Sequence, residues 1–241
     1  MRREFAYVIT CEHASPQVPE RWLPALEPLL AQCEEHRIWD PGTAEIGAEL
    51  ARLLDASFFP GEVCRLVVDL NRSLTHRDLF SPPIAALPDT EKTAILCRHY
   101  YPYRHRVLQE VESLLTANKS VLHLSIHSFT PRLDGEVREN DFGLLFDPWR
   151  KGENDLADVW LHYLRRRARD LLCLPNRPYL GISDGHAPVL RKLFRRQPYL
   201  GFELEFNQKL PLSENARFYA RWVHRTLMSA LESKTVAHLN E

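Results

Sequence analysis

The amino-acid sequence predicts a three-layer α/β protein in which a mainly parallel, mixed sheet lies between two layers of helices. Short apolar runs alternate along the chain with longer segments whose apolar residues recur at helical spacing. This alternation is typical of parallel strands joined by helices that cover both faces of a sheet. Three of the apolar runs end in polar clusters, at Glu12-His13, Asp69 to Arg72, and Ser125 to His127. Such strand ends meet at one edge of a sheet, where ligands bind.

The individual elements follow from the same two patterns. Strands are predicted at residues 5–10, 57–59, 64–70, 121–126, 142–146, 179–182 and 200–206. Helices are predicted at residues 40–54, 90–117 with a break near Pro102, 155–173, 189–196 and 211–231. Residues 79–89 and 128–140 are predicted to be loops, and the second is placed to close over a pocket.

The composition is that of an ordinary soluble globular protein, and we expect one domain spanning residues 1–241. Hydrophobic residues make up 44% of the chain and charged residues 26%. The 31 basic and 32 acidic residues nearly cancel, which argues against nucleic acid as the main partner because phosphate neutralisation needs a basic surface. No apolar run approaches the ~20 residues that cross a bilayer, and the N-terminus lacks a signal-peptide core. We therefore expect a cytoplasmic protein that does not bind membranes; its oligomeric state is left open.

Two histidines at strand ends predict a metal site. His13 follows the first strand, and the alternation of side chains along residues 121–127 places His127 at the exit of another. The five cysteines are widely spaced and form no Cys-x-x-Cys pair, so a thiolate site is not indicated. Catalytic zinc commonly takes three ligands from histidine and carboxylate and keeps a fourth position for water.

The third ligand has two candidates, Asp40 and Glu12. Asp40 has an alternative role, because Asp40-Pro41 suits a capping carboxylate followed by proline in the first helical turn. Glu12 has one as well, as a partner that orients His13. We favour Asp40 over Glu12.

Five ordered motifs carry a family resemblance that spans nearly the whole chain. They are Cys11-Glu-His-Ala-Ser15, Asp40-Pro-Gly-Thr43, Cys64-Arg-Leu-Val-Val-Asp-Leu-Asn-Arg72, Ser125-Ile-His-Ser128 and Gly201-Phe-Glu-Leu-Glu-Phe-Asn207. Together they resemble the motifs of the N-formylglutamate amidohydrolase family, and the run from Arg65 to Arg72 is the most specific. That family is similar to the zinc carboxypeptidases and to the succinylglutamate desuccinylase and aspartoacylase-type deacylases.

The resemblance implies a phosphorylase/hydrolase-like α/β fold and an enzyme with one zinc ion that hydrolyses the amide of an N-acyl amino acid such as N-formyl-L-glutamate. Carried over by position, His13 and His127 match metal-ligand histidines. The third ligand stays open, because Pro16 stands where the related peptidases have the glutamate of a His-x-x-Glu pair.

The resemblance also implies roles for residues outside the metal site. Asn71 and Arg72 are similar to a pair that holds the substrate α-carboxylate, and Glu205 to a general base. In that mechanism Arg65 would stabilise the oxyanion. Glu203 shares a strand face with Glu205, so chain geometry alone leaves both open as the base.

Some side chains near these motifs have a simpler expected role. Asp69 is expected to pair with an arginine at the strand end, and His186 to lie on the surface. Two other functions also fit the motifs. One is a zinc metallopeptidase that cuts a small peptide or cell-wall fragment. The other is a non-catalytic protein that binds a small carboxylate through Asn71 and Arg72.

Overall fold

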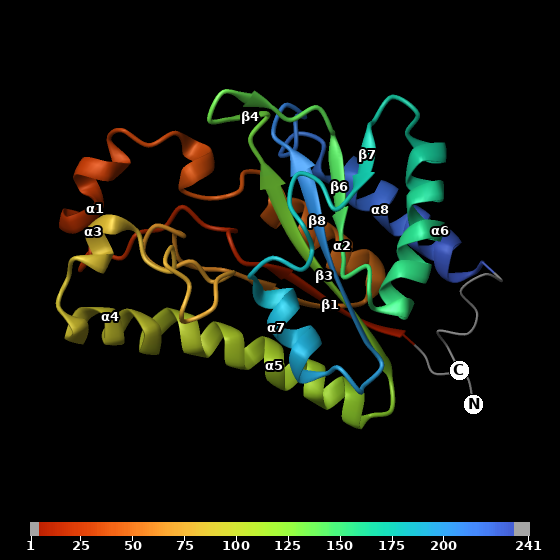
Figure 1. The fold of residues 1–241 in the computed structure, drawn as a ribbon, viewed down its shortest axis with the longest axis horizontal. Helices are drawn as coiled ribbons and strands as arrows, with labels where there is room; N and C mark the ends of the chain where they lie inside the picture. Colours follow the sequence, from red (N-terminus) through yellow and green to blue (C-terminus); the bar gives the residue numbers. More distant parts are fainter. Residues whose placement is uncertain (1–4, 234–241) are drawn as a thin grey trace.

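The computed structural model, which describes residues 5–233, is built around one six-stranded sheet. Its strand order is β2-β1-β3-β8-β6-β7. The strands are β1 (Phe5–Cys11), β2 (Ser57–Pro60), β3 (Ser120–Phe129), β6 (Phe142–Leu145), β7 (Cys173–Pro175) and β8 (Tyr199–Asn207). The first four strands in this order run parallel, whereas β6 is antiparallel to β8 and parallel to β7. The predicted mixed, mainly parallel sheet is therefore confirmed (Figure 1).

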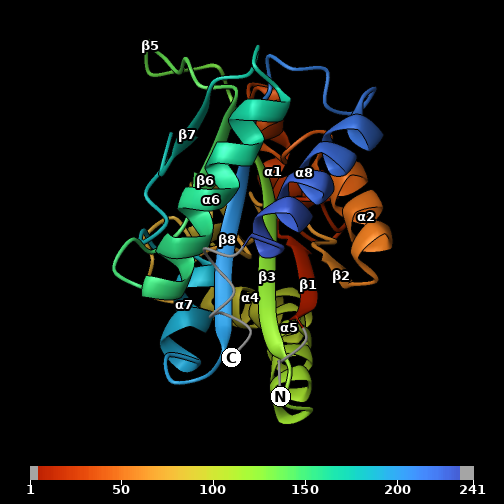
Figure 2. The same ribbon diagram turned by 90° about the vertical axis from the view of Figure 1, so that its right-hand side faces the viewer.

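Helices cover both faces of this sheet, which confirms the three predicted layers (Figures 1 and 2). One core cluster joins a face of the sheet to α2 (Thr43–Leu54), α6 (Lys151–Arg167) and α8 (Ala216–Leu231). A second cluster joins the other face to α1 (Leu23–Leu30), α3 (Pro82–Ala85), α4 (Asp89–Ile95), α5 (Tyr101–Thr116) and α7 (His186–Leu193). No helix within residues 5–233 is long and apolar enough to span a bilayer.

The central strand β3 positions the polar strand end. All ten of its residues are buried, between β1 on one side and β8 on the other. Leu122, Leu124 and Ile126 belong to the first core cluster, so the alternate side chains, His127 among them, point to the opposite face. The register places His127 directly beside Glu205 of β8. Residues that lie far apart in sequence thus meet at one end of the sheet.

The prediction of a strand at residues 64–70 is wrong. The segment forms turns, and its apolar side chains, including Val67 and Val68, pack into the second core cluster. Its backbone bonds go to separate loops, since Cys64 N donates to Gln17 O and Asp69 N to Leu79 O. The segment is buried but has no neighbouring strand, which explains the error. A short apolar run in the sequence indicates that its residues are buried, but it does not indicate which groups its backbone will hydrogen-bond.

Other element boundaries also differ from the prediction. Residues 179–182 are not a strand, and β7 was not predicted. The loop at 128–140 contains a hairpin of β4 (Arg132–Leu133) and β5 (Glu136–Val137), and the loop at 79–89 contains α3. The helix α1 and a short 3-10 helix (Glu35–Arg37) were also missed. At the predicted break near Pro102 the chain forms a π-helical turn (Leu96–Tyr100) immediately before α5. Pro102 stands in the first turn of α5, where a residue without a backbone N–H is tolerated.

Candidate active site

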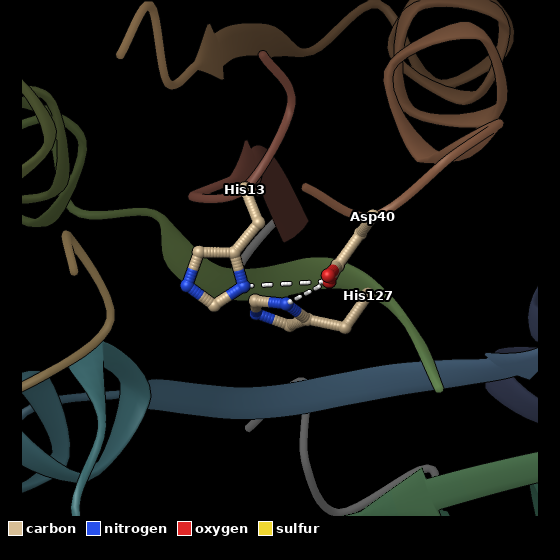
Figure 3. A group of neighbouring side chains, drawn as sticks. All are labelled: His13, Asp40 and His127. Atoms are coloured by element: carbon tan, nitrogen blue, oxygen red, sulfur yellow. Dashed lines mark hydrogen bonds and ion pairs between the residues drawn. The ribbon is translucent and has the colours of Figure 1, made fainter. Parts of the chain in front are cut away.

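Three buried side chains from separate elements converge at the carboxyl end of the sheet (Figure 3). His13 follows β1, Asp40 precedes α2, and His127 lies near the end of β3. One potential ligand atom from each lies within 4.8 Å of the others. Larger surface hollows exist, one of ≈ 510 Å³ beside Pro41 and Leu212, but residues 5–233 contain no second group of this kind.

The imidazole rings present the same atom, Nδ1, to the carboxylate between them. Asp40 Oδ2 lies 3.0 Å from His127 Nδ1 and 3.4 Å from His13 Nδ1. The opposite nitrogens are held by other carboxylates: His13 Nε2 lies 2.7 Å from Asp69 Oδ1, and His127 Nε2 lies 3.2 Å from Glu12 Oε2. A carboxylate at Nε2 keeps the proton of the neutral ring there and leaves the Nδ1 lone pair for a metal. The donor set therefore fits a divalent cation.

The two candidates for the third ligand take different places around the histidines. Asp40 is not the N-cap of α2: Gly42 takes that place, with φ +79° and no side-chain cap bond. Asp40 supplies only its backbone oxygen to Thr43, which leaves the carboxylate free to face the histidines. Glu12 lies on the far side of His127, and its proposed role as the partner of His13 is wrong.

Glu12 instead links the strand ends to α7. Its Oε2 accepts a hydrogen bond from Ser125 Oγ at 2.6 Å, and its Oε1 lies 3.0 Å from His186 Nδ1. The prediction that His186 lies on the surface is therefore wrong, since the residue is buried. Its main partner is 174 positions away along the chain, so no local pattern could have shown the contact.

The carboxylate of Glu205 is buried with little hydrogen bonding to offset its loss of water. It is 5% exposed, and its Oε2 has no hydrogen-bond partner among the described residues. Burial, with the charges of Asp40 and Glu203 adding to it, raises the pKa of Glu205 to about 7, although His127 acts in the opposite direction. Burial also raises the pKa of Glu203. A carboxyl group whose pKa lies near neutrality can both accept and return a proton.

The remaining predicted residues surround this carboxylate. Arg65 Nη2 donates to Asp69 Oδ2 at 2.9 Å, which confirms the expected pairing of Asp69 with an arginine. Asn71 Oδ1 accepts from His186 N, and Arg72 Nη1 donates to Asp184 O at 2.9 Å. All seven predicted site residues line one cavity of ≈ 270 Å³, namely His13, Asp40, Arg65, Asn71, Arg72, His127 and Glu205.

Comparison with known proteins agrees with this arrangement. The family model for N-formylglutamate amidohydrolase matches residues 5–212. The chain belongs to the N-formylglutamate amidohydrolase family. No curated protein matches the sequence of this amidohydrolase.

Two solved structures resemble this amidohydrolase over nearly its whole length. The gene product Atu2144 of Agrobacterium tumefaciens has a TM-score of 0.80 at 25% identity, with 95% of this chain and 91% of that chain covered. An N-formylglutamate amidohydrolase from Ralstonia eutropha JMP134 has a TM-score of 0.68 at 18% identity, with 98% of this chain and 93% of that chain covered.

The amidohydrolase cavity has a wall that the sequence did not reveal. Seven further residues line it: Ser128, Leu145, Tyr179, Leu180, Ser183, Asp184 and Glu203. Most of them belong to residues 179–184, an irregular segment between β7 and α7. Arg138, from the loop at 128–140, donates to Tyr179 Oη at 3.0 Å and lies over its ring. That loop therefore supports the cavity wall.

Proposed function

We propose that this protein is a zinc-dependent amidohydrolase acting on an N-formyl or other short N-acyl amino acid, such as N-formyl-L-glutamate, which it cleaves to formate and the free amino acid. The observation that carries the proposal is the placement of the His13, Asp40 and His127 group beside the unpartnered carboxylate of Glu205 in one small cavity. Two histidines and a carboxylate are a common ligand set of catalytic zinc.

The proposed metal would be held by Nδ1 of His13, Nδ1 of His127 and the carboxylate of Asp40. A zinc ion supplies Lewis-acid polarisation of the scissile carbonyl and acidifies the attacking water. Asp69 and Glu12 hold the two imidazoles from behind, at Nε2, and so fix the direction in which Nδ1 points.

The protein's own groups would move the proton and hold the substrate. Glu205 takes a proton from the attacking water and gives it to the departing amine nitrogen. Arg72, which is 31% exposed, binds the α-carboxylate with Asn71 beside it. Arg65 places its positive charge next to the metal ligands, where the carbonyl oxygen becomes negative in the transition state.

The cavity volume bears on the peptidase alternative. A peptidase must admit chain on both sides of the scissile bond. The cavity holds ≈ 270 Å³, below the ~300 Å³ at which pockets for drug-sized ligands begin. This volume suits a single acylated amino acid.

Metal analysis of protein purified without a histidine tag tests the proposal. We expect one zinc per chain, loss of formyl hydrolysis after chelation, and recovery when zinc is restored. Rates on formyl, acetyl and peptidyl derivatives of several amino acids then identify the acyl group. Absence of stoichiometric divalent metal, together with no hydrolysis after zinc is added, would rule the proposal out. Ligand binding without any hydrolysis would favour the carboxylate-binding alternative.

A further inference from the structure

The pairing of the arginines around the cavity bears on which side chain the substrate carries. Arg65 is already paired with carboxylates of the protein. Its Nη2 donates to Asp69 Oδ2 at 2.9 Å, and its Nη1 lies 3.5 Å from Asp40 Oδ1. Both carboxylates are buried. Because removing one partner would leave a buried charge unpaired, Arg65 is not available to bind a carboxylate of the substrate.

Arg72 is the second arginine that lines the cavity, and it has capacity for one anion. Its Nη1 donates to Asp184 O, and its Nε is 4.0 Å from Asp69 Oδ2. Its Nη2 takes part in none of the contacts found within residues 5–233. In the proposed function this free donor group is used by the α-carboxylate of the substrate.

Two other cations, on loops beside the site, do not line the cavity. Arg138 lies 5.0 Å from the ring centre of Tyr179 and 5.9 Å from that of Phe129, and it does not line the cavity. Lys209 Nζ is 2.8 Å from Asp141 Oδ1 and donates to a backbone oxygen. Neither supplies a second binding group for an anion.

The rest of the wall is apolar, hydroxylic or acidic. Leu145 and Leu180 contribute aliphatic surface, and Tyr179 contributes its ring and hydroxyl. Glu203, buried beside Glu205 on β8, places a second acid in the same cavity. A second carboxylate on the substrate would therefore lose its hydration without gaining a cation, which is costly.

We infer that the substrate carries an uncharged side chain: an N-formyl or short N-acyl amino acid of the glutamine, methionine or leucine kind, in preference to the glutamate derivative. The inference rests on the proposed function, because Arg72 is assigned there to the α-carboxylate. It places N-formyl-L-glutamate, which the proposed function also admits, below the uncharged derivatives in preference.

The test compares N-formyl-L-glutamine with N-formyl-L-glutamate, which match in size and differ in charge. We expect kcat/KM at neutral pH to favour glutamine by about tenfold or more, and N-formyl-L-leucine also to exceed glutamate. A kcat/KM for glutamate equal to or above that for glutamine overturns the inference.

Added charge tests where the side chain of the substrate lies. Leu180 lines the cavity and is 54% exposed, so Leu180→Arg brings a cation to the wall without filling the core. We expect it to shift the glutamate-to-glutamine ratio of kcat/KM towards glutamate by about tenfold. Leu193→Arg is the matched control, because Leu193 is 59% exposed and lies outside the cavity. An equal ratio in both variants would contradict the inference, because a cation added to the wall would then not change the preference for an uncharged side chain.

A binding measurement distinguishes failure of this inference from failure of the proposed function. Calorimetric titration of zinc-loaded Glu205→Gln with the two formyl amino acids reads the preference without turnover. If wild type hydrolyses neither compound nor any other N-acyl derivative tested, the proposed function fails, whereas the titration still measures the charge preference of the cavity, and tighter binding of the glutamine derivative supports the inference. Equal or tighter binding of the glutamate derivative, or binding of neither, overturns it.

Discussion

Replacement of Glu205 by glutamine removes the proposed base while preserving the shape of the side chain. Glu205 Oε2 has no hydrogen-bond partner within residues 5–233, so the substitution breaks no contact at that atom. General acid–base groups typically contribute about 10²–10⁴-fold to a rate, which corresponds to ~3–5 kcal/mol of transition-state stabilisation. We expect kcat of the zinc-loaded variant to fall by about that factor, with KM changed by less than about threefold.

The same substitution should stabilise the metal-free fold at higher pH. Burial raises the pKa of Glu205 from the ordinary 4.5 to about 7, so the folded state keeps this proton where the unfolded state has lost it. The contribution of Glu205 to the free energy of unfolding is fully present below about pH 4.5 and is lost as the pH rises through about 7. The total loss is ~3 kcal/mol. Glutamine has no such proton to lose. The free energy of unfolding of the variant, relative to wild type, should therefore increase across this window.

Steady-state kinetics and urea unfolding of chelator-treated protein at several pH values measure the two effects. Glu203→Gln is the matched control, because Glu203 is buried on the same strand and its pKa is also raised by burial. If Glu205→Gln kept the wild-type kcat and Glu203→Gln lost it, the base would be Glu203, and the assignment to Glu205 would be wrong. A stability difference that does not change with pH would refute the argument from burial.

Three further substitutions test the support of the proposed metal ligands, the substrate site and the turn before α2. Asp69→Asn removes the carboxylate behind His13 and should weaken zinc binding by about 10–100-fold in a chelator competition assay; unchanged affinity would show that Asp69 does not support the ligand. Arg72→Lys keeps the charge but loses the planar fork, so KM should rise about tenfold or more with a smaller effect on kcat, and an unchanged KM would remove Arg72 from the substrate site. Gly42→Ala should cost about 1–3 kcal/mol in urea unfolding, since φ is +79° and the new Cβ would lie 2.5 Å from a neighbouring side chain; Gly135→Ala, with φ +86° and open space, should cost less, and equal losses would exclude crowding as the cause.

Those parts of the site that follow regular strands were predictable from the sequence. The predicted strands at residues 5–10 and 200–206 lie within β1 and β8, and β3 extends the prediction for 121–126 by a few residues at its carboxyl end. Each is a buried apolar run that ends in polar residues, which is a pattern the chain carries locally. Parallel alignment then brings their ends together.

Contacts made by irregular segments were not predictable in the same way. The residues from Arg65 to Arg72 reach the cavity from turns. The pairing of Asp69 with an arginine was expected from a shared strand face, although residues 64–70 form no strand and the partner is Arg65, four residues earlier in the turns. A strand is predicted at residues 179–182, whereas the irregular segment 179–184 forms a wall of the cavity. Its backbone follows tertiary contacts, such as Gly181 N donating to Asn176 Oδ1, that no periodicity records.

The choice between Asp40 and Glu12 shows what kind of information the sequence lacked. Both carboxylates contact His127, and both are buried, so composition and proximity along the chain cannot separate them. They differ in which ring nitrogen they face: Asp40 faces Nδ1 and Glu12 faces Nε2. A metal bound at Nδ1 needs its other ligands on that side of the ring, whereas a carboxylate at Nε2 holds the proton and orients the ligand. In the proposed function the two acids would therefore have complementary roles around one imidazole, Asp40 as a metal ligand and Glu12 as the group that orients the ring.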